Sequence, residues 1–137
     1  MHTDKTTSTI KAPKTSLHHL YDVFQSAKRS LDFYTEELQY LQKLLADIVS
    51  ANTKVDVLSQ AEHFQNQFII VRDTLAELKS RINERLLDVE KQIRLTPTHT
   101  DEKSVSDLTQ YSVELQRAES SFAAMKMEFH SFLAKYL

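Results

Sequence analysis

The chain has 137 residues, of which 26% are charged and 41% are hydrophobic, and its formal net charge is −2. This length and composition suit one domain with a packed core and are short for two domains. Acidic and basic residues are interspersed, whereas a nucleic-acid binder needs a basic face that displaces counterions from phosphates. We therefore expect no nucleic-acid partner for the body of the chain.

Glycine and cysteine are both absent. Phosphate-binding loops need glycine where the backbone approaches the ligand, and cysteine is required for disulfides, thiol catalysis and cysteine-based zinc sites. The longest run of aliphatic and aromatic residues covers 68–71, far short of the ~20 residues that cross a bilayer. We expect a cytoplasmic protein that is not an enzyme, uses no cofactor and has no membrane partner.

Residues 1–14 are rich in threonine and lysine, and Pro13 closes the segment. This composition predicts a polar, flexible N-terminal tail. The alternatives are a docking arm, or an arm that binds nucleic acid through its lysines. Residues 15–137 are expected to form one domain.

The first helix is expected over residues 16–51, with Thr15 or Ser16 as its N-cap. Ten consecutive a and d positions of its heptads are apolar or aromatic, which indicates a long helix that buries one seam. The pattern breaks near Asn52. Because the chain has no glycine, we expect Asn52 to adopt the left-handed conformation that often ends a helix.

The second helix is expected over residues 54–94, with Phe64 and Phe68 in its seam. Arg85 occupies a later d position of this heptad pattern. We expect Leu86 to take its place, because a helix of 3.6 residues per turn drifts across a repeat of 3.5 residues.

The third helix is expected over residues 102–136, and the short breaks between helices predict that each helix runs back along the preceding one. The expected fold is an all-α, antiparallel up-down-up three-helix bundle of long helices with coiled-coil-like heptad packing. Each core layer takes one residue from each helix. Expected layers include Leu38/Phe68/Phe129, Leu41/Phe64/Phe132 and Tyr34/Val71/Met125.

Several apolar and polar side chains fall outside the seam. Apolar residues that gather on otherwise charged helices indicate a contact surface, and amides suit such a surface because they both donate and accept hydrogen bonds. The expected partner is a second copy of the chain, in a homodimer, or another helical protein. The candidate interface residues are Phe33, Tyr40, Leu44, His63, Asn66, Gln67, Ile69 and Ile70.

The alternative function is a bundle that binds a metal or a small ligand through Glu62, His63, His130 and the nearby amides. Di-iron bundles use a Glu-x-x-His spacing, which this sequence lacks, and Glu62 and His63 point about 100° apart on a helix. We therefore assign no catalytic, cofactor-binding or metal-binding residue. A ligand role for His63 would need a second helix to bring another ligand to it.

Two segments of the chain carry a family resemblance. Residues 31–38 read LDFYTEEL, and residues 62–69 read EHFQNQFI. These segments resemble uncharacterised bacterial proteins that are predicted to be long helical hairpins or three-helix bundles. The resemblance covers residues 20–90 and implies the same fold. It implies no activity and no functional residues, since that family has no assigned activity.

Overall fold

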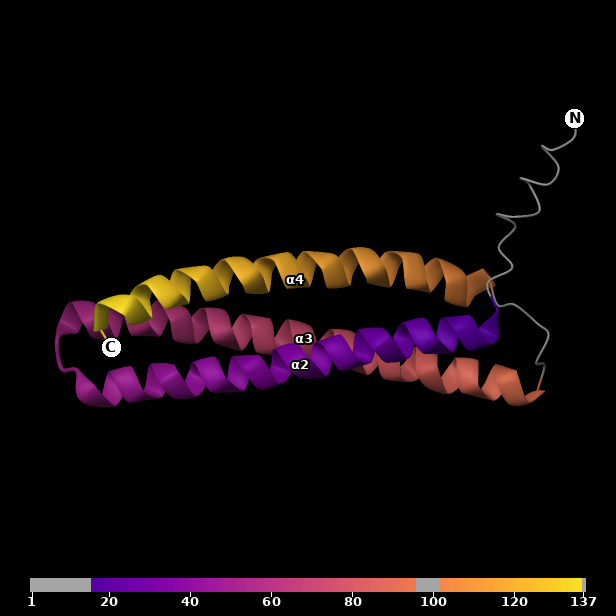
Figure 1. The fold of residues 1–137 in the computed structure, drawn as a ribbon, viewed down its shortest axis with the longest axis horizontal. Coiled ribbons are helices and arrows are strands. Elements are labelled where there is room, and N and C mark those ends of the chain that lie inside the picture. Colours follow the sequence, from indigo (N-terminus) through magenta and orange to yellow (C-terminus); the bar gives the residue numbers. More distant parts are fainter. Residues whose placement is uncertain (1–15, 96–101, 137) are drawn as a thin grey trace, which may run out of the picture.

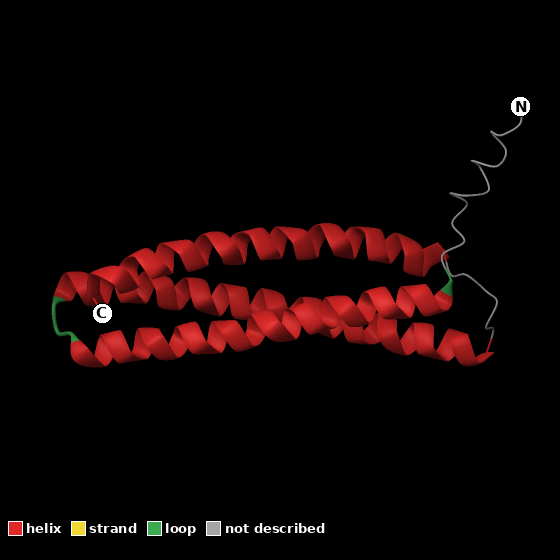
Figure 2. Ribbon diagram, viewed as in Figure 1, coloured by secondary structure: helices red, strands yellow, loops and turns green. Residues whose placement is uncertain are grey.

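A computed structural model describes residues 16–95 and 102–136 of the chain. It contains three helices: α2 (Leu17–Ala51), α3 (Val55–Leu95) and α4 (Glu102–Tyr136). The described ranges contain no strand (Figure 2). The prediction of an all-α protein with three helices that pack against one another is therefore confirmed. The predicted tail, residues 1–14, lies outside the described residues.

The three helices lie side by side in an elongated body (Figure 1). The starts of α2 and α4 lie at one end with the end of α3, and the loop from α2 to α3 lies at the other end with the end of α4. The backbones of α2 and α3 approach each other more closely than either approaches α4. None of the described helices is long and apolar enough to cross a membrane.

The two ends of α2 are capped in different ways. At its start, the Ser16 hydroxyl accepts a hydrogen bond from the backbone N–H of His19 at 3.1 Å, as expected for an N-cap. At its end, Asn52 has φ −129° and ψ 141°, which is extended backbone. The prediction of a left-handed Asn52 is therefore wrong. Its side-chain amide instead donates to the carbonyl of Ile48 at 2.8 Å, which satisfies a carbonyl that the helix end leaves free.

The core follows the predicted seam from one end of the bundle to the other. The largest fully buried side chains are phenylalanines from all three long helices: Phe24, Phe68 and Phe129. In the second half of α3 the core passes to Leu86, which is buried, while the Arg85 side chain is 17% exposed and forms ion pairs with Asp88 and Asp107. The shift of the stripe from Arg85 to Leu86 is therefore confirmed.

Aromatic rings fill the contact between α3 and α4. The ring centroids of Phe64 and Phe132 lie 5.1 Å apart, and those of Phe68 and Phe129 also lie 5.1 Å apart. Both pairs were predicted to share a layer. On α2, the Tyr34 ring contacts Phe122 at 5.3 Å, one layer away from the Met125 predicted to face it. Bulky rings of this kind keep the α4 backbone further from its neighbours.

Candidate functional site

The structure leaves most of the predicted interface residues open to solvent. Phe33, Tyr40 and Ile70 each expose 60% or more of their surface. Leu44 is half-buried and packs against the core. Gln67 is also half-buried, and its side-chain oxygen is enclosed without a hydrogen-bond donor among the described residues. The remaining candidates are exposed: His63, Asn66 and Ile69.

These candidates do not lie on one face. Ile69 lines a groove with Gln42 and Ala46 of α2, whereas the adjacent Ile70 lines a groove with residues of α4. Phe33 lies on α2, where its ring meets Tyr34 at 5.8 Å. Neighbours in sequence on a helix point about 100° apart, so Ile69 and Ile70 belong to different surfaces.

The groove between α3 and α4 is an apolar hollow that includes the candidate residue Ile70. Its volume is about 300 Å³, at the small end of the range for ligand pockets. Buried and half-buried apolar side chains form its floor, and the exposed Ile70 stands at one rim. The floor consists of Val71, Leu75, Leu78 and Ala118. The short side chains of Thr74 and Ser121 also line the groove.

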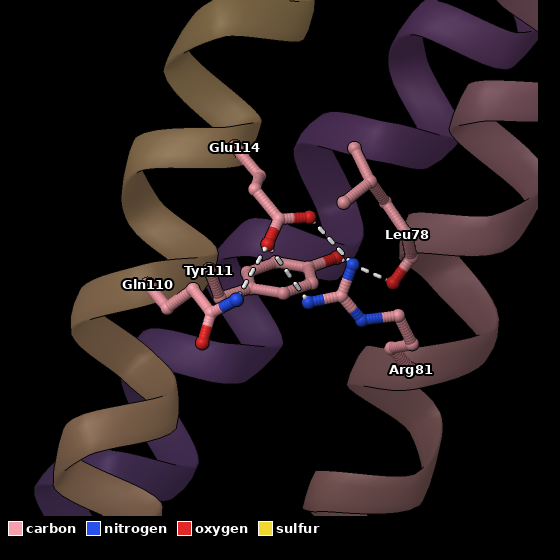
Figure 3. A network of polar contacts seen from close by, with 5 residues as sticks. All are labelled: Leu78, Arg81, Gln110, Tyr111 and Glu114. Atoms are coloured by element: carbon pink, nitrogen blue, oxygen red, sulfur yellow. Dashed lines mark hydrogen bonds and ion pairs between the residues drawn. The ribbon is translucent and has the colours of Figure 1, made fainter.

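A network of polar contacts (Figure 3) lies at one end of this groove and shares Leu78 and Glu114 with its lining. Arg81 of α3 forms a two-pronged ion pair with Glu114 of α4, with N–O distances of 2.5 and 3.1 Å. The hydrogen bond from Arg81 holds the pKa of Glu114 below its usual range, and the bond to Glu114 raises the pKa of Arg81. Gln110 also donates to Glu114 at 3.3 Å, so the carboxylate is fixed from two directions.

Tyr111 lies beneath this ion pair and is itself buried. Its hydroxyl donates to the backbone carbonyl of Leu78 at 2.5 Å, and the Arg81 guanidinium lies 5.6 Å from the ring centroid. Burial raises the pKa of the Tyr111 hydroxyl. The ring also meets Phe24 of α2 edge-on at 6.4 Å, so this one side chain joins all three helices.

Beyond the other end of the groove, His63 approaches α4. Its Nε2 lies 3.9 Å from a carboxylate oxygen of Glu128, and both side chains are more than half exposed. The described residues contain no group of three or more histidine, aspartate or glutamate side chains that could hold a metal ion. Glu62 and His130, the other residues of the alternative ligand set, are exposed.

Sequence reasoning did not select the charged and hydroxyl side chains that border the groove. Glu77 and Arg117 line it from opposite helices, as do Thr74 and Ser121. In the sequence these charged and hydroxyl side chains look like ordinary solvent-exposed residues, because they lie beside the seam and no run of one residue type marks them. The seam register determines which residues of α3 and α4 lie at the same height along the bundle. Pairing the residues beside the seam by that register would have placed these side chains together.

Comparisons with known proteins found no relative of this chain. No protein-family model matches the chain, no curated protein matches it, and no solved structure matches it. The resemblance of residues 31–38 and 62–69 to bacterial helical proteins stays a prediction, and the function has to be argued from the chain's own surface.

Proposed function

We propose that this protein is a non-enzymatic helical bundle, antiparallel and packed in coiled-coil-like heptads, that acts by contacting other chains and self-associates as a homodimer. The observation that carries the proposal is the Ile70 side chain, which exposes 65% of its surface at the rim of the apolar groove between α3 and α4. An exposed branched apolar side chain beside an apolar hollow is typical of a contact surface.

Two kinds of contact support the bundle arrangement. The ring pairs Phe64–Phe132 and Phe68–Phe129 join residues whose numbers rise along α3 and fall along α4. The ion pair between Lys79 and Asp32 links α3 to α2. A thin bundle with one side chain per helix in each layer leaves much of every helix in water, and small cores of this kind gain from oligomerisation.

The absence of glycine and cysteine also favours an interaction role over catalysis, since phosphate-binding loops and the Gly-x-Ser-x-Gly nucleophile elbow need glycine and thiol catalysis needs cysteine. A cytoplasmic location fits a chain without cysteine, because disulfides are rare in that compartment. We propose it on that ground alone.

Light scattering coupled to size-exclusion chromatography tests the proposal. We expect the purified chain to elute with twice its 15.9 kDa mass and to shift toward the monomer on dilution. A mass that stays at one chain up to the highest soluble concentration would rule out the homodimer.

A further inference from the structure

Apart from Glu114, which is bound to Arg81, each rim of the groove between α3 and α4 carries one charged side chain. Glu77 lies one helical turn before Arg81 on α3, and Arg117 lies about one turn after Glu114 on α4. Because Arg81 is bound to Glu114, the exposed Glu77 and Arg117 lie at about the same height on opposite rims. The face thus presents an acid on α3 level with a base on α4.

Two turns further along the same helices, α3 carries a large apolar side chain and α4 carries a small one. Ile70 lies seven residues before Glu77, and Ala124 lies seven residues after Arg117. Seven residues are about two helical turns. The Phe68–Phe129 ring contact shows that lower residue numbers on α3 and higher residue numbers on α4 lead toward the same end of the bundle. The prominent, exposed Ile70 is therefore level with the exposed, short Ala124.

We propose that a second copy of the chain packs on this face around a two-fold axis parallel to the helices, so that α3 of each copy lies on α4 of the other. This inference rests on the self-association proposed above. Such a rotation keeps every residue at its height and exchanges the two rims. It places each Ile70 against the Ala124 of the other copy, and each Glu77 against the other copy's Arg117. Both pairs occur twice and both are complementary.

The other simple arrangement has its two-fold axis perpendicular to the helices, within the plane of the face. That rotation would lay α3 on α3 and reverse the order of heights. Centred on the groove, it would place Glu77 of one copy against Ile70 of the other. Burying a carboxylate against an apolar side chain without a partner is costly, so the charges favour the parallel axis.

The face is large enough for a stable dimer. A helix with its side chains is about 10 Å wide, and 35 residues of helix are about 52 Å long, so α3 and α4 together offer on the order of 1,000 Å² per copy. Stable interfaces bury about 800 Å² on each partner. Short side chains at Ser121 and Ala124 allow the second copy's helix to approach closely.

The first test compares two substitutions on α3 that expose a carboxylate in place of an equally exposed apolar side chain. Ile70 exposes 65% of its surface and Leu87 exposes 66%. We expect Ile70→Asp to weaken dimerisation by at least about tenfold, and Leu87→Asp to leave the dimer dissociation constant unchanged, in sedimentation equilibrium. Circular dichroism confirms that both variants keep their helices.

The second test reverses charges and separates contacts between copies from contacts within one. Glu77→Arg alone and Arg117→Glu alone should each be monomeric, because four like charges would then meet at one height. Mixed together, these two variants should form a heterodimer, since arginines at positions 77 and 117 of one copy would face glutamates at the same two positions of the other. The doubly substituted chain should dimerise with itself.

The outcomes distinguish a failure of this dimer arrangement from a failure of the proposed self-association on which it rests. If the unmodified chain is monomeric, both fail. If it dimerises but Ile70→Asp behaves like Leu87→Asp, or the mixed charge variants stay monomeric, the chain self-associates by another face and the arrangement is overturned.

Discussion

At the scale of single residues, Tyr111 makes the most connections of any side chain in the groove network. It is buried, donates to the Leu78 carbonyl, packs edge-on against Phe24 and lies under Arg81. Tyr111→Phe keeps the ring and removes only the hydroxyl, which leaves the Leu78 carbonyl with its helical partner. We expect a loss of about 0.5–1.5 kcal/mol in the free energy of unfolding, measured by urea denaturation.

Tyr40→Phe is the matched control. Tyr40 is 60% exposed on α2, so loss of its hydroxyl should change the free energy of unfolding by no more than about 0.5 kcal/mol. Equal effects of the two substitutions would show that the Tyr111 hydroxyl contributes nothing specific.

The pH dependence gives a second readout of the same substitution. Burial raises the pKa of Tyr111 above its ordinary value of 10.0, so the folded state keeps its proton at a pH where the unfolded state loses it. The stabilisation by the hydroxyl is therefore complete below pH 10 and declines as the pH rises above it. We expect the stability difference between the unmodified chain and Tyr111→Phe to be constant from neutral pH to about pH 10 and to shrink by about pH 11. A constant difference across this range would contradict a buried hydroxyl.

Residue-scale features divide into those that the sequence predicts and those that it does not. The Ser16 cap follows from the residue type next to a helical pattern. The conformation of Asn52 does not, because an asparagine can end a helix through its backbone or through its side chain, and here the side-chain bond to Ile48 prevails. The bond from Tyr111 to a backbone carbonyl depends on the distance between two helices, which no local pattern contains.

At the scale of elements, the phenylalanine rings between α3 and α4 fasten α4 to the rest of the bundle. Phe129 is fully buried and contacts the rings of Phe64, Phe68 and Phe132. We expect Phe129→Ala to cost about 3–5 kcal/mol in urea unfolding, because it removes contacts with three rings and leaves a cavity. Met127, two residues earlier on the same helix, is 73% exposed, and Met127→Ala should cost less than about 0.5 kcal/mol. Similar costs would mean that α4 is not anchored by these rings.

The sequence predicts contacts between two consecutive helices of the chain better than contacts between α2 and α4, which are separated in the chain by α3. The α3–α4 pairs Phe64–Phe132 and Phe68–Phe129 follow from the single turn between those helices. The height of α2 against α4 depends on two turns in succession, and there Tyr34 contacts Phe122 one layer from its predicted neighbour. Leu133 is buried as well as Phe132, although the heptad pattern places only Phe132 in the core.

At the scale of the whole molecule, the surface is divided into separate grooves by the three helices. Periodicity identifies which apolar residues lie outside the seam, and Phe33, Tyr40 and Ile70 are indeed exposed. It does not decide which groove each residue borders, because that depends on how the helices are arranged around the axis. This is why Ile69 and Ile70 read as one cluster in the sequence and line two different grooves in the structure.

A dimer built on the α3/α4 face can be trapped directly, since the chain has no cysteine of its own. Ile70→Cys and Ala124→Cys are prepared as separate proteins, one carrying an affinity tag, then mixed and oxidised. Cysteines join only when their Cα atoms come within about 7 Å, which the proposed arrangement allows between position 70 of one copy and position 124 of the other.

The measurement is the mass of the covalent products on a non-reducing gel. We expect the mixture to give a disulfide-linked dimer that contains one tagged and one untagged chain, and each variant alone to stay uncrosslinked. A mixture that yields no mixed dimer, or an Ile70→Cys protein that links to itself as readily as to Ala124→Cys, would contradict the packing of α3 on α4 between two copies.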